Sequence, residues 1–247
     1  MLASTDSLVH VTAGAITLEG NLSIPDGARG IVLFAHGSGS SRHSPRNRFV
    51  ARELQQRSLG TLLIDLLTAQ EEQVDMRTAH LRFDIGLLAH RLVVATDWLR
   101  DQPETASLKL GYFGASTGAA AALVAAAERP DRVAAVVSRG GRPDLAGSAL
   151  PHVKAPTLLI VGGDDVPVIG LNRQADARLN VEKRIEIVPG ASHLFEEPGT
   201  LEEVAVCWGV VRAVSGGRTL RHGGTGPSAR VGGRISQLQL PSGCRVC

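Results

Sequence analysis

A serine stands between two glycines in the segment Gly114-Ala115-Ser116-Thr117-Gly118. An apolar run precedes this segment and an alanine-rich run follows it, which predicts a strand that turns sharply into a helix. Such a turn leaves room only for small residues two positions before and after its centre, and it presents the central hydroxyl at the helix N-terminus. We therefore predict that Ser116 is a nucleophile. A glycine-rich turn with a helix-capping serine is the alternative.

Two aspartates follow another apolar run, in the segment Gly162-Gly163-Asp164-Asp165-Val166. An aspartate at the end of a strand can orient a catalytic histidine and stabilise its imidazolium form. The alternative role is that of an acid in a turn or at a helix cap. We favour Asp165 over Asp164 as the orienting acid, and the sequence leaves both open.

His193 lies in the segment "VPGASHLFEEPG", after the last apolar run. A single histidine in a loop is ordinarily only solvated. Here, however, Ser116, Asp165 and His193 follow one another in the chain order of nucleophile, acid and base that α/β-hydrolases use. Because each of the three was found separately at a predicted strand end, we predict that they form a catalytic triad.

The segment "HGSGSSRHSPRNR", residues 36–48, follows the first long apolar run. An oxyanion hole needs one backbone N–H from the residue after the nucleophile and a second from a loop at this point of the fold. Thr117 and Ser38 are the candidates for these two donors, with Gly39 beside Ser38 as a substrate contact. His36 is expected to brace this loop.

Arginines gather in the loops on the same side of the predicted sheet. Arg42, Arg46 and Arg139 are candidates for binding a substrate carboxylate, and Arg142 follows nearby. For most of them, structural ion pairs or simple solvation is the favoured interpretation.

The elements that must position these residues alternate along the chain. Continuous apolar runs are typical of parallel strands covered on both faces, and amphipathic stretches between them predict helices. The strands are predicted at 30–37, 60–67, 108–114, 133–141, 156–163 and 184–190, and the helices at 45–58, 82–100, 117–129, 168–180 and 200–213. An edge hairpin precedes them. This order predicts an α/β fold with a doubly wound, mostly parallel sheet.

The charge of the 247-residue chain is divided unevenly, since residues 1–208 carry a net charge of −4 and residues 209–247 a net charge of +6. We predict one domain over residues 1–215 and a disordered Gly/Arg-rich tail over 216–247. The acidic body argues against a nucleic-acid partner. No basic leader with an apolar run and no membrane-length apolar run occurs, and the cysteines fit no zinc pattern, so we expect a cytoplasmic protein without membrane contact or metal.

Five segments resemble the α/β-hydrolase superfamily and, within it, the dienelactone hydrolase-like bacterial hydrolases. They are "HGSGSSRHSPRN", "GYFGASTGAAAAL", "SRGGRPDLA", "TLLIVGGDDVPVIGLN" and "VPGASHLFEEPG". The resemblance implies Ser116 as nucleophile, Asp165 as acid and His193 as base, in a fold without a cap domain. Dienelactone hydrolases carry cysteine where this chain has Ser116. Such relatives usually end with the last helix, so our hypothesis is that the tail is a frame-shifted or otherwise non-native terminus.

The function predicted from these observations is hydrolysis of small carboxylic esters or lactones through an acyl-enzyme on Ser116, without a cofactor. The expected binding partner is a small-molecule ester substrate. The sequence leaves open whether the chain forms a homodimer. Acyl transfer, perhydrolysis and a non-catalytic binding role for the fold are the alternatives. A phosphoribosyltransferase is disfavoured, because no phosphate-binding loop of serines and threonines follows the acid pair, and a dinucleotide site is disfavoured because 111–118 does not match G-x-G-x-x-G.

Overall fold

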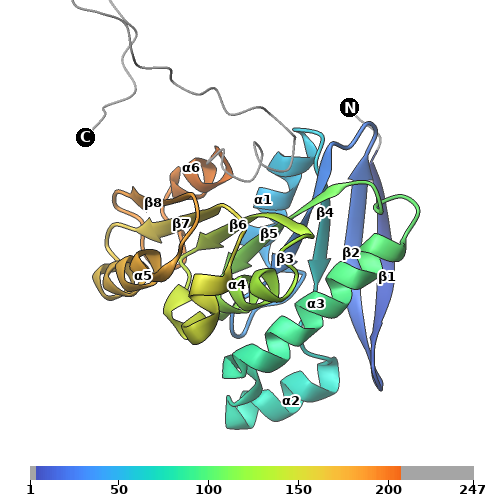
Figure 1. Ribbon diagram of the computed structural model, residues 1–247, viewed down its shortest axis with the longest axis horizontal. Coiled ribbons are helices and arrows are strands. Elements are labelled where there is room, and N and C mark those ends of the chain that lie inside the picture. Colours follow the sequence, from blue (N-terminus) through green and yellow to red (C-terminus); the bar gives the residue numbers. More distant parts are fainter. Residues whose placement is uncertain (1–3, 207–247) are drawn as a thin grey trace, which may run out of the picture. The chain divides into compact units, whose positions relative to one another are not determined.

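An eight-stranded sheet with helices on both faces makes up residues 4–206, the part of the chain that the computed structural model describes (Figure 1). The strand order is β1-β2-β4-β3-β5-β6-β7-β8. β1 (Ser4–Ala13) and β2 (Ile16–Pro25) form an antiparallel hairpin, and β2 also pairs antiparallel with β4, whereas all other pairs are parallel. The predicted doubly wound, mostly parallel sheet with an edge hairpin is confirmed.

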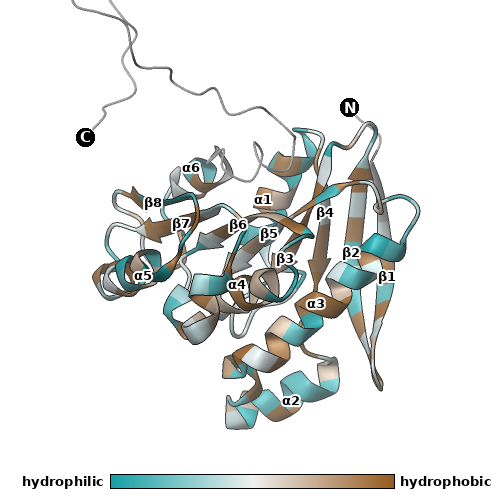
Figure 2. Cartoon of the chain, viewed as in Figure 1, coloured by the Kyte–Doolittle hydropathy of each residue, from teal (hydrophilic) through white to brown (hydrophobic). Residues whose placement is uncertain are grey.

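The parallel strands overlap the six predicted apolar runs. They are β3 (Gly30–Ala35), β4 (Gly60–Ile64), β5 (Lys109–Ala115), β6 (Val133–Arg139), β7 (Thr157–Gly162) and β8 (Lys183–Val188). Every residue of β3, β4 and β7 is buried. Helices cover both faces of these strands, so both sets of alternating side chains must be apolar, and the central strands are largely brown in Figure 2.

Two groups of helices cover the sheet. α1 (Pro45–Gln55) and α6 (Thr200–Val206) pack on one face, where Phe34 and Phe113 belong to the core. The larger core on the other face lies under α3 (Ile85–Asp101), α4 (Thr117–Glu128) and α5 (Val166–Arg178). The arrangement brings the carboxyl ends of the parallel strands to one edge, where ligands bind in folds of this type.

The prediction missed α2 (Ala69–Thr78), and its helix 82–100 merged part of the short 3₁₀ helix η1 (Leu81–Phe83) with α3. α2 buries only Asp75, so its sequence lacks the apolar period that indicates an amphipathic helix. A capping box at its start was the available signal: the Thr68 side chain accepts from the Glu71 N–H, and the Glu71 carboxylate accepts from the Thr68 N–H.

The connection between β6 and β7 holds only the 3₁₀ segment η2 (Pro143–His152), so the fold carries no cap domain there, as predicted. No helix within residues 4–206 is long and apolar enough to cross a membrane. The predicted tail, 216–247, and the last part of the predicted helix 200–213 lie outside the described residues.

Gly118 allows α4 to pack against the chain that leaves β3, and this close approach gives a stability prediction. A Cβ at residue 118 would overlap the carbonyl oxygens of Ala35 and His36, whereas a Cβ at Gly170 in α5 would meet nothing within 4 Å. We expect Gly118→Ala to lower the free energy of unfolding by about 3 kcal/mol. The control Gly170→Ala should raise it by about 0.5–1 kcal/mol, because alanine is the better helix former. Urea unfolding followed by circular dichroism measures both, and equal effects would contradict the packing argument.

Candidate active site

Ser116 lies at the sharp turn that the sequence predicts, between the end of β5 and the start of α4. Its backbone has φ 49° and ψ −122°, a conformation that is strained for a residue with a side chain. A Cβ at Gly114 would come within 2.5 Å of the Cα of Ala119, so this glycine is needed for the turn, whereas Gly118 is needed where α4 contacts the chain after β3. The Ser116 side chain makes no capping hydrogen bond to α4, which speaks against the capping alternative.

His193 is hydrogen-bonded to Asp165 and not to Asp164. The Nδ1–H of His193 donates to Oδ2 of Asp165 over 2.6 Å, and the Asp165 side chain is 13% exposed. Asp164 is exposed, and its backbone N–H donates to the carbonyl of Ala191. Asp165 does not cap α5 with its side chain. The geometry therefore favours Asp165 as the acid that orients His193. Because Nδ1 of the ring is bonded to Asp165, Nε2 is the nitrogen left to accept a proton.

Two glycines let the loop of His193 approach the strand ends. Gly140 has φ 50°, and a Cβ there would lie 2.7 Å from the carbonyl oxygen of His193. A Cβ at Gly162 would overlap the carbonyl oxygens of Ala191 and Ser192. The carboxylate of Glu197 accepts the Ser192 N–H over 3.0 Å, and this hydrogen bond lowers the pKa of Glu197. The close approaches at Gly140 and Gly162 and the hydrogen bond to Glu197 together fix the position of this loop.

Ser116 and His193 line one cavity of about 160 Å³ at the carboxyl ends of β5 and β6. Its other walls come from the loop after β3, from the end of β6 and from the loop of His193. They are formed by Gly37, Ser38, Ser40, Arg46, Ala115, Arg139, Gly140 and Leu194. The structure therefore brings the predicted nucleophile and base to the same small space, with Asp165 behind the base.

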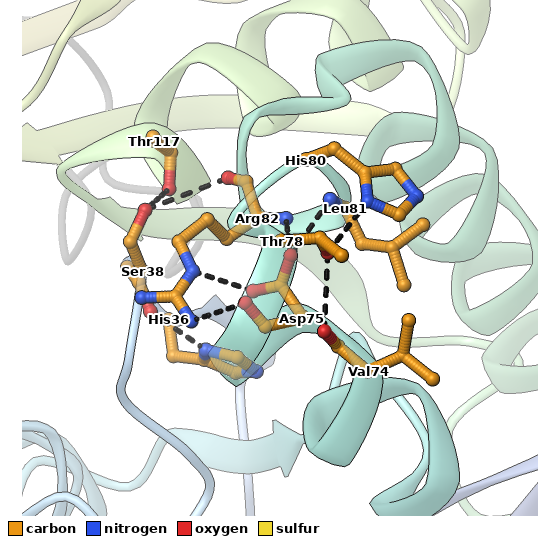
Figure 3. A network of polar contacts seen from close by, with 10 residues as sticks. His36, Ser38, Val74, Asp75, Thr78, His80, Leu81, Arg82 and Thr117 are labelled. Atoms are coloured by element: carbon orange, nitrogen blue, oxygen red, sulfur yellow. Dashed lines mark hydrogen bonds and ion pairs between the residues drawn. The ribbon is translucent and has the colours of Figure 1, made fainter.

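Ser38 and Thr117, the two candidates for the oxyanion hole, are joined through their side chains. Ser38 Oγ and Thr117 Oγ1 are 3.0 Å apart, and Ser38 Oγ donates to the carbonyl of Arg82 over 3.5 Å (Figure 3). His36 braces the same loop as expected, because its Nε2 accepts the N–H of Leu66 over 2.9 Å. These contacts fix where the loop after β3 meets the start of α4.

A second cavity, of about 230 Å³, lies on the other side of this loop and is the part of the site that the sequence did not predict. Gly39 lines this cavity and not the one that holds Ser116. Its further walls include Glu72, Asp75 and Arg82 of α2 and η1. Asp75 is buried, which by itself raises the pKa of a carboxyl, but its hydrogen bonds from Arg82 and from the Leu81 N–H hold the pKa of Asp75 below its usual range (Figure 3).

The four arginines of the sequence analysis have different surroundings. Arg42 is ion-paired with Asp65 and Glu19 and lines neither cavity, so its assignment as a substrate contact is not supported. Arg142 is ion-paired with Asp144 over 2.8 Å, outside both cavities.

Arg46 and Arg139 both line the cavity of Ser116. Arg46 contacts Glu196 over 2.8 Å.

Among residues 4–206, no group of three or more histidine, cysteine, aspartate or glutamate side chains is placed to hold a metal ion.

Comparison with known proteins bears on the same residues. A model of the dienelactone hydrolase family matches residues 49–207, and a solved structure of a dienelactone hydrolase from Anabaena variabilis is 66% identical. The chain belongs to the dienelactone hydrolase family. The alignment with the Anabaena structure covers 85% of this chain and 99% of that one, with a TM-score of 0.83. The family match over residues 49–207 includes Ser116, Asp165 and His193.

Other proteins that are similar to this chain carry different names. A Mycobacterium tuberculosis H37Rv protein, provisionally named a phosphoribosyl transferase, is 60% identical over 200 residues, which are 81% of this chain. Those residues are 44% of the relative, so this chain spans less than half of that relative's length. A dienelactone hydrolase-like promiscuous phosphotriesterase from metagenomic libraries shares the fold, with 20% identity, a TM-score of 0.67 and 82% and 94% of the two chains covered.

Proposed function

We propose that this chain hydrolyses small carboxylic esters or lactones through an acyl-enzyme on Ser116. The observation that carries the proposal is the hydrogen bond from His193 to Asp165, with His193 in the same cavity as the strained Ser116. A nucleophile, a base and a group that orients the base are the parts that acyl transfer needs. Membership of a family of hydrolases supports the same reaction class.

In the first half of the reaction, Ser116 Oγ attacks the carbonyl carbon of the ester while Nε2 of His193 accepts the hydroxyl proton. Asp165 accepts the hydrogen bond from Nδ1–H and stabilises the imidazolium that forms. The backbone N–H groups of Thr117 and Ser38 are the proposed donors to the oxyanion. When the tetrahedral intermediate collapses, the bond to the leaving alkoxide breaks and His193 returns the proton to it.

In the second half, His193 removes a proton from water, and the resulting hydroxide attacks the acyl carbon. The bond to Ser116 Oγ breaks, the serine regains its proton from His193, and a carboxylic acid leaves. The products of the whole cycle are one acid and one alcohol. For a lactone the two remain in one molecule.

The size of the cavity supports small substrates. About 160 Å³ lies next to Ser116, below the usual range of drug-sized sites, and the short η2 segment replaces the cap domain that could enclose a long chain. We therefore expect short acyl groups to react best.

A chain-length series of p-nitrophenyl esters, from acetate to octanoate, tests the proposed function. We expect turnover to be greatest for the short esters, because the cavity is small. Methanol or hydrogen peroxide added as a competing acceptor separates hydrolysis from acyl transfer and perhydrolysis, since each yields a different product. Absence of turnover on every ester by a folded protein would contradict the proposal and favour the binding role.

Phosphoribosyl transfer is a second candidate, and it rests on the provisional name of the Mycobacterium tuberculosis relatives. The acid pair after β7 gives it little support, because Asp165 is engaged with His193. Release of pyrophosphate from phosphoribosyl pyrophosphate in the presence of a nucleobase, with no dependence on Ser116, would favour it over hydrolysis.

A further inference from the structure

The second cavity, of about 230 Å³, is lined by a carboxylate that has no bonding partner. Glu72 of α2 lines this cavity and is half-buried. Among residues 4–206, its carboxylate makes no hydrogen bond and no ion pair. Burial, followed by the neighbouring carboxylate of Asp65, raises the pKa of Glu72. The protein therefore leaves the acceptor capacity of this side chain unused.

The adjacent Glu71 shows how the same helix satisfies a carboxylate that has a structural role. Glu71 accepts hydrogen bonds from Arg91 over 2.5 and 2.8 Å and from the N–H of Thr68 over 2.8 Å. Burial alone would raise the pKa of Glu71, but these hydrogen bonds hold it below its usual range. Glu71 lines neither cavity. Of the two adjacent carboxylates, the unsatisfied one is the one that lines the cavity.

The arginines around this carboxylate are already paired with other acids. Arg82, which lines the cavity, donates from Nε to Asp75 over 2.5 Å (Figure 3). Arg42 is ion-paired with both Asp65 and Glu19. Counting the unpaired glutamate, four carboxylates stand against two guanidinium groups here. This excess of negative charge favours a cation in the cavity.

The remaining wall of the second cavity suits an alkyl chain. Leu67 and Leu88 are buried, and the exposed Met76 adds a third apolar side chain. His36, which also lines the cavity, stays neutral because its Nε2 accepts the N–H of Leu66 over 2.9 Å. A chain of methylene groups that ends in a cation therefore matches both the apolar and the acidic part of the wall.

The position of the second cavity relative to the triad indicates which part of an ester would enter it. Nε2 of His193 must return a proton to the leaving alkoxide, so the leaving group lies beside His193, which lines only the cavity of Ser116. Thr117, one proposed oxyanion donor, lines only the second cavity, whereas Ser38, the other donor, lines both. The acyl group points away from the leaving group, and it is therefore directed past Ser38 toward the second cavity.

We propose that the second cavity binds the acyl group of the substrate and that Glu72 recognises a terminal ammonium on that group. The inference rests on the proposed function for the ester itself. An ammonium would form a charge-assisted hydrogen bond with the carboxylate. An unsubstituted alkyl chain of the same length would instead desolvate Glu72 without giving it a partner, which agrees with the expectation that plain acyl groups react best when they are short.

Two esters with the same leaving group test the proposal. p-Nitrophenyl 6-aminohexanoate and p-nitrophenyl heptanoate differ only in a terminal ammonium in place of a methyl group. We expect the wild-type kcat/KM, divided by the rate of uncatalysed hydrolysis, to favour the ammonium ester about 10-fold. This is the lower end of the range for hydrogen bonds to charged groups, because Glu72 is only half-buried.

Glu72→Gln keeps the size of the side chain and removes its charge, so it should remove most of the preference. Glu128→Gln, at an exposed glutamate of α4 that lines neither cavity, is the matched control and should keep the preference. A purely structural role of Glu72 would make Glu72→Gln lower kcat/KM equally for both esters, and that result would overturn the proposal. A wild-type protein without the preference, or a preference that survives in Glu72→Gln, would also overturn it.

Failure of the proposed function is seen separately, as no hydrolysis of either ester. In that case the cation site is tested by thermal unfolding at constant ionic strength with n-butylammonium chloride. A rise in the Tm of the wild type that is absent in Glu72→Gln supports the site. An equal rise in both proteins, or no rise in either, overturns it.

Discussion

Replacing Ser116 by alanine is expected to reduce ester hydrolysis to the background rate while the fold stays intact. The Ser116 hydroxyl is the group that forms the proposed acyl-enzyme. The other serines that line this cavity, Ser38 and Ser40, lie in the loop after β3 and not at the sharp turn before α4. Losing the nucleophile of such a triad lowers kcat by about 10⁴- to 10⁶-fold. Because the side chain makes no capping hydrogen bond, its loss should change Tm little.

The control for this variant is Ser148→Ala, which removes an exposed hydroxyl in η2 that lines neither cavity. Its kcat/KM on a short p-nitrophenyl ester should match that of the wild type. Circular dichroism and thermal unfolding establish that both variants are folded. A folded Ser116→Ala protein that retains more than a few per cent of wild-type activity would rule out the acyl-enzyme on Ser116.

The second large effect is expected for Asp165→Asn. An amide in place of the carboxylate can no longer stabilise the imidazolium, and it favours the wrong tautomer of His193. We expect kcat to fall by about 10³- to 10⁴-fold, with KM changed much less, because the lost interaction strengthens only as the imidazolium forms.

Asp164→Asn is the matched control, since the adjacent carboxyl is exposed and only its backbone is bonded, to Ala191. Its kcat should stay within a few-fold of the wild-type value. Steady-state kinetics on the same ester compare the two variants. Equal losses, or a larger loss in Asp164→Asn, would contradict the assignment of Asp165 as the orienting acid.

Much of the fold followed from the sequence because burial on both faces leaves a strong local signal. β3 and β7 are continuous apolar runs, which distinguishes them from the alternating hairpin at the edge. The turn at Ser116 was also local, because the steric demand for small residues is visible within five positions. Once the strands were placed, the rule that parallel strands end at one edge brought Ser116, Asp165 and His193 together.

Other features depend on contacts between distant parts of the chain and left no local signal. The choice between Asp164 and Asp165 depends on where the loop of His193 passes, which is set by the close approaches at Gly140 and Gly162. The arginines could not be told apart in the sequence, because the Asp65 that pairs with Arg42 lies 23 residues away. The helix α2 was not predicted, because a helix that buries only Asp75 has no apolar period.

The most direct test of the account is to trap the acyl-enzyme. The wild-type protein is mixed with a short p-nitrophenyl ester, quenched in acid within one turnover, and digested with trypsin for mass spectrometry. We expect an added acyl mass on the peptide 110–132, where Ser116 is the single serine, and fragment ions that assign the mass to that residue. A rapid release of nitrophenol with the acyl mass on another residue, or with none, would contradict it.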